Sequence, residues 1–400
     1  MPDSEKVSQG GPANFARLFY NYIAPNSEHQ WIGIMFKNSN SKKISIKKRF
    51  IFLRREFHCL NLPSDHFGQI TNAKSKIYPE KVLGKSIDRL TAFIKEKKVD
   101  IVFLNGFGVF NWMLLIAAKR AGVPTVIQHA GILTKELYIH RNSYSFFGIK
   151  IMVEMEKDSS RLASAEIFLN SWSMKYYNDN IHKNNKGKSL VIPLPFNFST
   201  FKEYTDNESV HKFRSSVDKN KFNIGIIARW DDIKNHAAVL SLAREIRKQG
   251  LNWQIYSVVD IPDNPKYRSQ KEEYQEYITI VPPLDRAGIS DFCRSMNMMI
   301  QPSIFDVSPT VVLESMSLNT PIMISPNIGY VNNFMKYGAK DWVIDWENIP
   351  KVVERIKKLK NKSIPKALRN HLIKAHDQAK VFSAYLKVFS TLSAKSNKLK

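Results

Sequence analysis

The sequence predicts an α/β protein with two Rossmann-like domains, each built on a doubly wound parallel sheet. Its 400 residues exceed what one hydrophobic core usually organises. From about residue 98, short apolar strands alternate with amphipathic helices, and the alternation starts again after a polar stretch at 197–221. Parallel sheets bind ligands beyond the carboxyl ends of their strands, so we expect a site in a cleft between the two domains.

The alternation sets the expected domain boundaries: an N-terminal domain at 1–200, a linker at 201–221, a C-terminal domain at 222–375, and a C-terminal helix with a basic tail at 376–400. Strands of the first domain are expected at 31–36, 100–104, 125–129, 166–170 and 190–194. Those of the second are expected at 222–228, 253–259, 277–281, 297–301, 321–325 and 341–345.

The apolar run 101–118 has nearly the length of a membrane span. Polar and small residues interrupt it, and a strand, a Gly-rich turn and a helix at 109–121 ended by Gly122 explain it better. Cys59 and Cys293 are too few for a disulfide framework, and the N-terminus lacks the features of a secretory signal. We therefore expect a cytoplasmic protein, soluble or peripheral to a membrane.

Charge favours an anionic partner. There are 60 Lys and Arg against 36 Asp and Glu, giving a formal net charge of +24. Nucleic acid, an acidic membrane surface and phosphorylated substrates all fit this excess. Because the sequence has no zinc finger, phosphate-binding Gly-rich loop or RNP-like signature, we do not expect a nucleic-acid partner.

The stretch "FDVSPTVVLESM" places two acids around a predicted helix start. Ser308 is a favourable N-cap and Pro309 a favourable first residue, with Asp306 before them and Glu314 beyond. A helix N-terminus binds anions, and flanking carboxylates accept hydrogen bonds from hydroxyl groups. A nucleotide sugar carries both kinds of group, although an isolated pair of acids would be explained equally well by the helix dipole and solvation. The backbone donors expected here are those of Ser308, Thr310 and Val311.

Two cations follow the first strand of the second domain, in "FNIGIIARWDDIKNH". Arg229 and Lys234 lie five residues apart, just past the strand end, where they are suited to hold a diphosphate and stabilise charge on a leaving group. Asp231 and Asp232, between them, are interpreted as a solvated turn rather than a metal site.

These segments together resemble retaining glycosyltransferases of the GT-B fold, in glycosyltransferase family 4. In that family a strand leads to an Arg with a Lys five residues later; a Pro-Ser element, an acid-x(7)-Glu pair and a "TP" strand follow. Here they are "ARWDDIK" and "PSIFDVSPTVVLESMSLNTPIMIS". "SQGGPANFARLFYNYI", "GVPTVIQHAG" and "VIPLPFNFSTF" resemble the family's Gly-Gly loop, the strand before its sugar-side His, and the exit from the first domain.

The resemblance implies roles for individual residues. Arg229 and Lys234 would hold the diphosphate, Glu314 the ribose, Asp306 the transferred sugar, and the backbone at Gly10 and Gly11 would approach the donor. Base recognition is expected from main chain near Pro283. The first domain would be the acceptor side, and the chemistry would need no metal and no cofactor beyond the nucleotide-sugar substrate.

The chain departs from the family at two places. Asp306 stands where the family usually has Glu and is one methylene shorter. A central strand should precede Gly10, but "MPDSEKVSQ" is too polar to form one, so we expect the given chain to begin after that strand.

His129 ends an apolar strand, which suits either a hydrogen-bonded core histidine or a contact to the sugar. The resemblance favours the sugar contact. Asn105, at the end of the preceding strand, is a weaker candidate for donor binding.

The run 41–58 is basic and interleaved with aromatic residues, so it is either a solvated face or a contact for anionic lipid on the inner face of the cytoplasmic membrane. Its members are Lys42, Lys43, Lys47, Lys48, Arg49, Arg54 and Arg55 with Phe50, Phe52 and Phe57.

We therefore expect a hexosyltransferase-type enzyme that moves a sugar from a UDP or GDP sugar to a glycan or lipid-linked acceptor, in cell-surface polysaccharide or glycolipid synthesis. One alternative is a nucleotide-sugar epimerase of the same fold, which would need a general base that only His129 offers. Another is a non-catalytic basic protein that binds nucleic acid or membrane; steep salt dependence of DNA binding would distinguish it.

Overall fold

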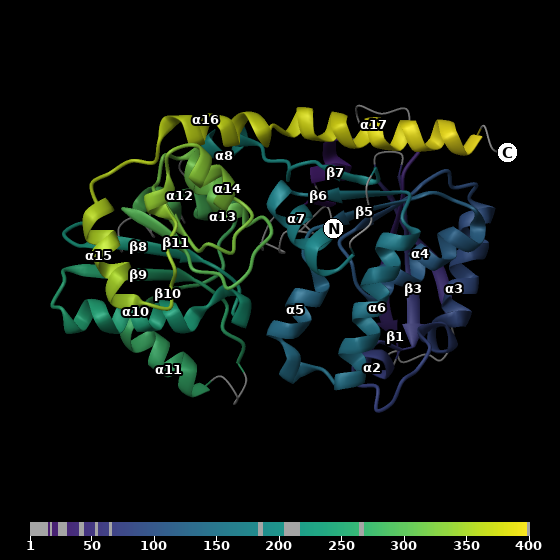
Figure 1. Cartoon of the computed structure of the whole chain (residues 1–400), viewed down its shortest axis with the longest axis horizontal. Coiled ribbons are helices and arrows are strands. Elements are labelled where there is room, and N and C mark those ends of the chain that lie inside the picture. The colour runs from purple at the N-terminus through teal and green to yellow at the C-terminus, as the bar shows by residue number, and fades with distance from the viewer. Residues whose placement is uncertain are drawn as a thin grey trace. The chain divides into compact units, whose positions relative to one another are not determined.

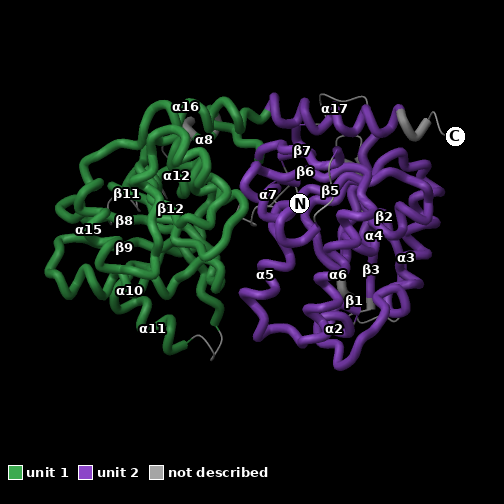
Figure 2. Tube along the Cα trace, viewed as in Figure 1, with its two compact units in different colours: residues 1–14, 194–378 green, residues 15–193, 379–400 purple. Residues whose placement is uncertain are grey.

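The structure of the protein, a computed structural model, describes residues 15–16, 18–22, 30–39, 44–52, 55–63, 66–182, 187–203, 217–263 and 268–397. They fall into two compact units (Figure 2): unit 1 contains residues 194–378, and unit 2 contains residues 15–193 and 379–400. Gly10, Gly11 and the stretch 1–9 lie outside the described residues, so the expectation of an absent first strand stays a prediction.

Unit 1 is built on a five-stranded parallel sheet with the strand order β10-β9-β8-β11-β12 (Figure 1). The strands are β8 (Phe222–Ile227), β9 (Trp253–Val258), β10 (Thr279–Val281), β11 (Met298–Gln301) and β12 (Ile322–Ile324). The helices are α8 (Phe198–Glu203), α10 (His236–Lys248), α11 (Arg268–Tyr277), α12 (Arg286–Ser295), α13 (Thr310–Ser317), α14 (Val331–Lys336), α15 (Ile349–Leu359) and α16 (Lys366–Ala375), with 3-10 turns η2 (Asp232–Lys234) and η4 (Lys340–Trp342).

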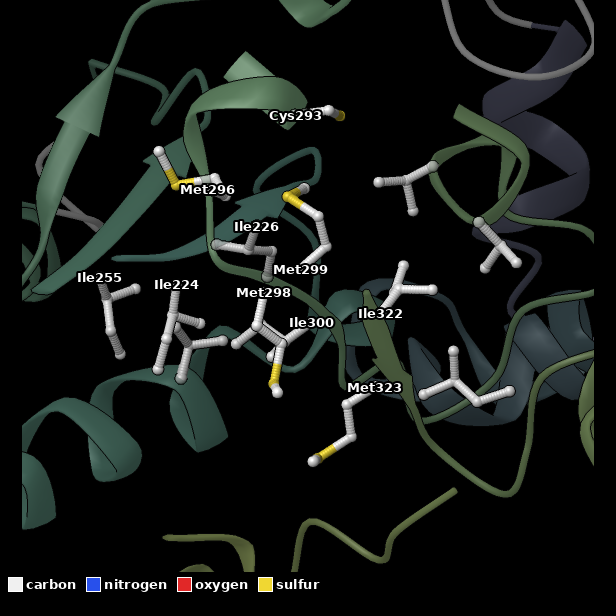
Figure 3. Packing of buried hydrophobic residues seen from close by; sticks show 14 of the residues in the cluster. Ile224, Ile226, Ile255, Cys293, Met296, Met298, Met299, Ile300, Ile322 and Met323 are labelled. Atoms are coloured by element: carbon white, nitrogen blue, oxygen red, sulfur yellow. The ribbon is translucent and has the colours of Figure 1, made fainter. Parts of the chain in front are cut away.

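The core of unit 1 surrounds the central strands β8 and β11. Their side chains are almost all apolar and buried, as expected for strands covered on both faces (Figure 3). Burying each Ile or Met side chain contributes roughly 1.5–3 kcal/mol. Gly225 is fixed by this packing, because a Cβ there would lie 2.6 Å from both Met296 Cγ and Met299 Sδ. β8 therefore approaches α12 closely, which sets the position of the strand end that leads to Arg229.

Unit 2 has two sheets among its described strands. The parallel sheet has the order β4-β5-β6-β7, and the three-stranded sheet has the order β1-β3-β2 with β2 antiparallel to β3. The strands are β1 (Ile32–Ser39), β2 (Ser45–Phe52), β3 (Arg55–Pro63), β4 (Val102–Asn105), β5 (Thr125–His129), β6 (Ala165–Phe168) and β7 (Ser189–Val191). The helices are α2 (His66–Thr71), α3 (Pro79–Glu96), α4 (Val109–Ala121), α5 (Leu133–Ile139), α6 (Phe146–Leu162), α7 (Ser171–Asn180) and α17 (Gln378–Asn397), with the turn η1 (Arg141–Ser143).

α17 completes the core of unit 2, although it comes last in the chain. It begins at Gln378, the last residue of unit 1, and its remainder belongs to unit 2. Phe382, Tyr385 and Phe389 of α17 are buried; the Tyr385 and Phe389 rings lie 5.9 and 5.4 Å from the ring of Phe103 on β4. Aromatic pairs at such distances add to the apolar burial, so this helix is an integral part of unit 2.

Several expectations from the sequence are confirmed. The α/β class with parallel sheets is correct, and the helix 109–121 ends at Gly122, whose φ of 73° is the left-handed conformation that glycine adopts easily. Among the helices of the described ranges, none combines the length and apolarity that a membrane crossing requires.

Other expectations were wrong. Residues 341–345 form no strand, because the 3-10 turn η4 buries Trp342 and leaves a single bridge from Val343 to Ile324. The antiparallel hairpin β2–β3 was not expected, since its cations obscure the alternation of apolar residues. Phe201 and Val217, near the ends of the expected linker 201–221, are buried in the core of unit 1, and residues 204–216 between them lie outside the described residues.

Candidate functional site

The loop after β8 carries Arg229 and Lys234 and is fixed by local hydrogen bonds. Asp231 Oδ1 accepts from the backbone N–H of Ile233 at 2.9 Å and caps the 3-10 turn η2. Asn235 adopts the left-handed conformation with a φ of 59° and caps α10. The two aspartates therefore belong to a turn, as the sequence indicated, but Asp231 is only 19% exposed and stabilises the turn.

Two further bonds attach this loop to the segment that follows β11. The backbone N–H of Ile304 donates to the carbonyl of Ile233 at 2.8 Å, and Asn235 Nδ2 donates to the carbonyl of Pro302 at 3.2 Å. The carboxyl ends of β8 and β11, which neighbour each other in the sheet, are therefore held together by their loops.

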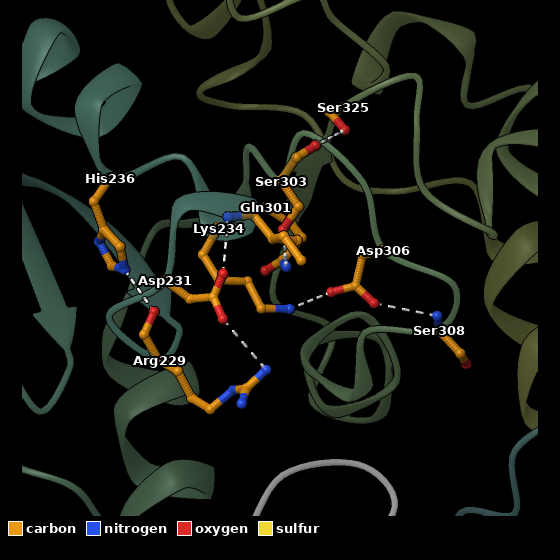
Figure 4. A network of polar contacts seen from close by, with 10 residues as sticks. Arg229, Asp231, Lys234, His236, Gln301, Ser303, Asp306, Ser308 and Ser325 are labelled. Atoms are coloured by element: carbon orange, nitrogen blue, oxygen red, sulfur yellow. Dashed lines mark hydrogen bonds and ion pairs between the residues drawn. The ribbon is translucent and has the colours of Figure 1, made fainter. Parts of the chain in front are cut away.

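Lys234 and Asp306 form an ion pair at this edge of the sheet (Figure 4). Lys234 Nζ lies 2.5 Å from Asp306 Oδ2, and the two side chains are 17% and 13% exposed. The other oxygen, Oδ1, accepts from the backbone N–H of Ser308 at 3.2 Å. Lys234, which the sequence predicts to hold the diphosphate, therefore pairs with Asp306, which it predicts to hold the transferred sugar.

Helix α13 begins later than the sequence predicted. Its first residue is Thr310 and its N-cap is Pro309, which offers no side-chain cap. Ser308 does not cap the helix, because its backbone N–H is held by Asp306 and its hydroxyl pairs with the Tyr330 hydroxyl at 2.9 Å. Thr310 and Val311 lie in the first turn, and the side chain of Val311 is buried.

Glu314 is a half-buried acid on α13. Burial raises the pKa of its carboxyl to about 7, and the positive charge of Arg286 at the start of α12 opposes this shift. Burial, then the charges of Asp306 and Glu314, also raises the pKa of the Tyr330 hydroxyl. The charges of Asp306 and Glu314 therefore both affect the pKa of the Tyr330 hydroxyl.

Arg229 differs from Lys234 in its freedom. Its side chain is 73% exposed, and its Nη2 lies 3.7 Å from Asp231 Oδ2. Its backbone is fixed, because His236 Nε2 donates to the carbonyl of Arg229 at 2.8 Å. His236 is buried and stacks on Trp230 with ring centroids 4.6 Å apart, and burial lowers the pKa of its imidazole. The guanidinium can thus reorient towards an anion while its loop stays in place.

The sequence reasoning missed several supporting residues. His236 was not singled out, although its position two residues after Lys234 at a helix start was a usable signal. Gln301, Ser303 and Ser325 form a buried polar group (Figure 4), with Gln301 Nε2 donating to Ser303 Oγ at 2.8 Å and Ser325 Oγ to the Ser303 carbonyl at 2.6 Å. The contact of Ser325 with Ser303 joins residues that are 22 positions apart, which no local pattern predicts.

Pro283 lies in the exposed loop between β10 and α12, at the carboxyl end of β10. It lies at the same edge of the unit 1 sheet as Arg229 and Asp306, and its role in base recognition stays a prediction.

In unit 2 the predicted polar residues His129 and Asn105 are paired with other side chains, and His129 is buried. His129 Nε2 lies 3.0 Å from Glu166 Oε1, neither side chain has exposed surface, and the His129 ring stacks on Phe168. This is the core histidine that the sequence left open; in this conformation its ring offers no surface to a sugar. Asn105 Oδ1 accepts from Gln128 Nε2 at 3.1 Å, and Gln128 Oε1 accepts from the Tyr385 hydroxyl at 2.6 Å.

The basic run 41–58 is only partly described. Lys42, Lys43 and Arg54 lie outside the described residues, and so do the side chains of Arg49, Phe50, Phe52 and Arg55. Lys47 is exposed, but Lys48 Nζ lies 2.9 Å from Glu56 Oε1, and Phe57 is buried in the core. Hydrogen bonds from Lys48, His58 and Lys97 lower the pKa of the Glu56 carboxyl to about 2. One cation of the run is therefore already neutralised.

No group of three or more His, Cys, Asp and Glu side chains suited to a metal ion occurs in the part of the chain that the structure describes. The expectation that the chemistry needs no metal stays a prediction.

Comparisons with known proteins show what this chain is similar to. Residues 207–378 match the profile of the family described as Glycosyl transferases group 1, a range that includes Arg229, Lys234, Asp306 and Glu314. The chain is similar to Protein CapJ of Staphylococcus aureus, with 24% identity over 299 residues that cover 73% of this chain and 68% of CapJ. It is also similar to the putative glycosyltransferase EpsF of Bacillus subtilis, with 23% identity over 138 residues that cover 34% of this chain and 36% of EpsF.

Solved structures show the same fold. An α,α-trehalose-phosphate synthase (UDP-forming) from Burkholderia xenovorans, in complex with glucose-6-phosphate, superposes with a TM-score of 0.73 at 11% identity and covers 97% of this chain and 98% of its own. The chain thus has the GT-B fold and carries a glycosyl transferases group 1 domain, and it is a glycosyltransferase.

Proposed function

We propose that the protein transfers a sugar from a nucleoside-diphosphate sugar to an acceptor hydroxyl with retention of anomeric configuration. The observation that carries this proposal is the ion pair of Lys234 with Asp306 at the carboxyl edge of the unit 1 sheet, with Arg229 on the same loop as Lys234 and Glu314 on α13, the helix that follows Asp306. Cations suit the diphosphate and carboxylates suit hydroxyl groups, so the set matches both halves of such a donor.

In the proposed reaction, the bond between the anomeric carbon and the diphosphate oxygen breaks as negative charge grows on the diphosphate. Lys234 and Arg229 stabilise that charge, Lys234 from a fixed position and Arg229 by moving from Asp231 to the phosphates. The acceptor oxygen bonds to the anomeric carbon from the same face, and the departing diphosphate takes its proton. The resemblance to family 4 enzymes supports this course.

Glu314 accepts hydrogen bonds from the ribose hydroxyls in this proposal, and the backbone near Pro283 recognises the base. The solved structure of the UDP-forming synthase with glucose-6-phosphate supports a UDP sugar as the first donor to test. A lipid-linked or glycan acceptor, a cell-surface polysaccharide setting and peripheral contact with the inner face of the cytoplasmic membrane through 41–58 remain part of the proposal.

The test is a thermal-shift screen of the protein against UDP, GDP and their hexose conjugates, since a ligand that binds only the native state raises its stability. We expect one nucleotide series to raise the melting temperature. Product analysis with the selected donor then fixes the anomeric configuration by NMR. An inverted product would contradict retention, and the absence of any nucleotide effect would contradict the donor class.

A further inference from the structure

The side chain of Asp306 is held from both of its oxygens. Oδ2 lies 2.5 Å from Lys234 Nζ, and Oδ1 accepts from the Ser308 backbone N–H at 3.2 Å. The side chain is 13% exposed, close to the 17% of Lys234, so both groups of the pair are held in place while some of their surface stays open to a ligand.

The backbone of Asp306 is fixed as well. Its N–H donates to the Asn327 carbonyl at 3.1 Å, and its carbonyl accepts from the Gly329 N–H at 2.9 Å, in a bridge with the segment after β12. Asp306 therefore has little freedom to turn away from Lys234 when a ligand arrives.

Lys234 is the partner that needs a fixed position. A lysine side chain has many rotamers, and a cation that stabilises a leaving group acts best when it is already in place. Its turn is attached to the segment after β11 through Ile233 and Asn235, so the backbone of Lys234 is set. Asp306 sets the other end, the ammonium group. An ammonium has three N–H donors, so two remain for phosphate oxygens after one goes to Asp306.

We propose that Asp306 is a positioning residue, which holds the Lys234 ammonium in place for the leaving diphosphate. The proposal rests on the proposed function, because it assumes a nucleoside-diphosphate leaving group. It also accounts for an aspartate here, since the shorter side chain reaches Lys234 from a backbone that is already bonded on both sides.

The two roles differ in one measurable way. A positioning residue affects the binding of a nucleoside diphosphate that carries no sugar, whereas a sugar ligand affects only the nucleotide sugar. We would measure the affinities of UDP and GDP by calorimetry for the wild-type protein, Asp306→Asn, Asp306→Glu, Lys234→Ala and the double variant Asp306→Asn/Lys234→Ala.

For the nucleotide that the wild type binds, Asp306→Asn is expected to lower affinity about tenfold, as for a lost charge-assisted contact. Lys234→Ala should have at least this effect, and the double variant should bind no more weakly than Lys234→Ala. Asp306→Glu keeps the charge but displaces it by one methylene, so a smaller loss is expected. Asp341→Asn is the matched control, because Asp341 pairs with Arg355 elsewhere in unit 1.

Unchanged affinity for the free nucleotide in both Asp306 variants, together with weaker binding of the nucleotide sugar, would overturn the inference and leave the proposed function standing. If Asp306→Asn does not fold, as judged by circular dichroism, Asp306→Glu gives the same decision. A wild-type protein that binds neither UDP nor GDP would overturn the proposed function and this inference with it.

Discussion

The polar residues at the strand ends of the two units have different surroundings. In unit 1, Arg229 is largely exposed, and the Lys234–Asp306 pair keeps some exposed surface. In unit 2, His129 and Glu166 have none, and they bond to each other. In the sequence, Arg229 and Lys234 of unit 1 and His129 of unit 2 all appear as polar residues at or just past the end of an apolar strand. Burial therefore separates residues that can meet a ligand from residues that stabilise a core.

This comparison predicts that substitutions in unit 1 change activity more than stability, and that substitutions in unit 2 change stability first. Substitutions at Arg229, His129, Glu314 and Tyr385 test this distinction.

The largest effect is expected for Arg229→Ala. Removing one group that stabilises a developing anion typically lowers turnover about 10²-fold to 10³-fold. Because the Arg229 side chain is 73% exposed, the melting temperature should hardly change. Steady-state rates and thermal unfolding check this. Arg244→Ala, which removes a partly exposed arginine paired with Glu273 in the same unit, should keep its turnover; equal losses in both variants would remove the distinction.

His129→Ala is expected to lower the free energy of unfolding of unit 2 by about 2–4 kcal/mol, since it leaves a cavity and deprives Glu166 of a buried partner. Urea denaturation measures the change, with the partly exposed His182→Ala as the control. A variant of normal stability whose catalytic rate alone has fallen would instead favour the sugar contact that the family resemblance implies.

Glu314 should make nucleotide affinity depend on pH. With a pKa of about 7, its carboxyl is mostly protonated at pH 6 and mostly ionised at pH 8, and the ionised form accepts ribose hydroxyl hydrogen bonds best. The ratio of wild-type to Glu314→Gln affinity is therefore expected to rise several-fold over this range. Using the ratio cancels the titration of the nucleotide itself, and a flat ratio would exclude Glu314 as the ribose ligand.

The same raised pKa has a consequence for stability. The folded state holds a proton on Glu314 that the unfolded state, with a pKa near 4.5, releases earlier. The contribution of this group to the free energy of unfolding should therefore fall as pH rises from about 4.5 to about 7 and stay constant above. Glu314→Gln should not show this fall.

The smallest effect is expected for Tyr385→Phe. It removes the hydrogen bond from α17 to Gln128 while keeping the aromatic packing, and should lower the free energy of unfolding by about 1 kcal/mol. The exposed Tyr138→Phe is its control. A loss of activity without a loss of stability would show that the Gln128–Asn105 pair acts on a ligand, against the distinction drawn here.

The sequence predicted what depends on local pattern. Apolar runs located most strands, and the strand 125–129 and the helix 109–121 were predicted with their observed ends. Their position just past a strand end selected Arg229 and Lys234, and an expected helix start selected Asp306. The pairing of Lys234 with Asp306 could not be predicted, because the two residues are 72 positions apart and are brought together by hydrogen bonds between their loops. The burial of His129 could not be predicted either, because its partner Glu166 lies on another strand. Ser308 was misjudged as a cap because its competing partners, Asp306 and Tyr330, could not be seen.

The place of α17 has a consequence for biosynthesis. Its aromatic side chains belong to the core of unit 2, yet the ribosome makes them only after all of unit 1. Domains usually fold as they emerge, so unit 1 can complete its sheet during translation while unit 2, although made earlier, must wait for its last helix. A nascent chain stalled before residue 379 should thus hold a folded unit 1 and an unfinished unit 2 that chaperones recognise.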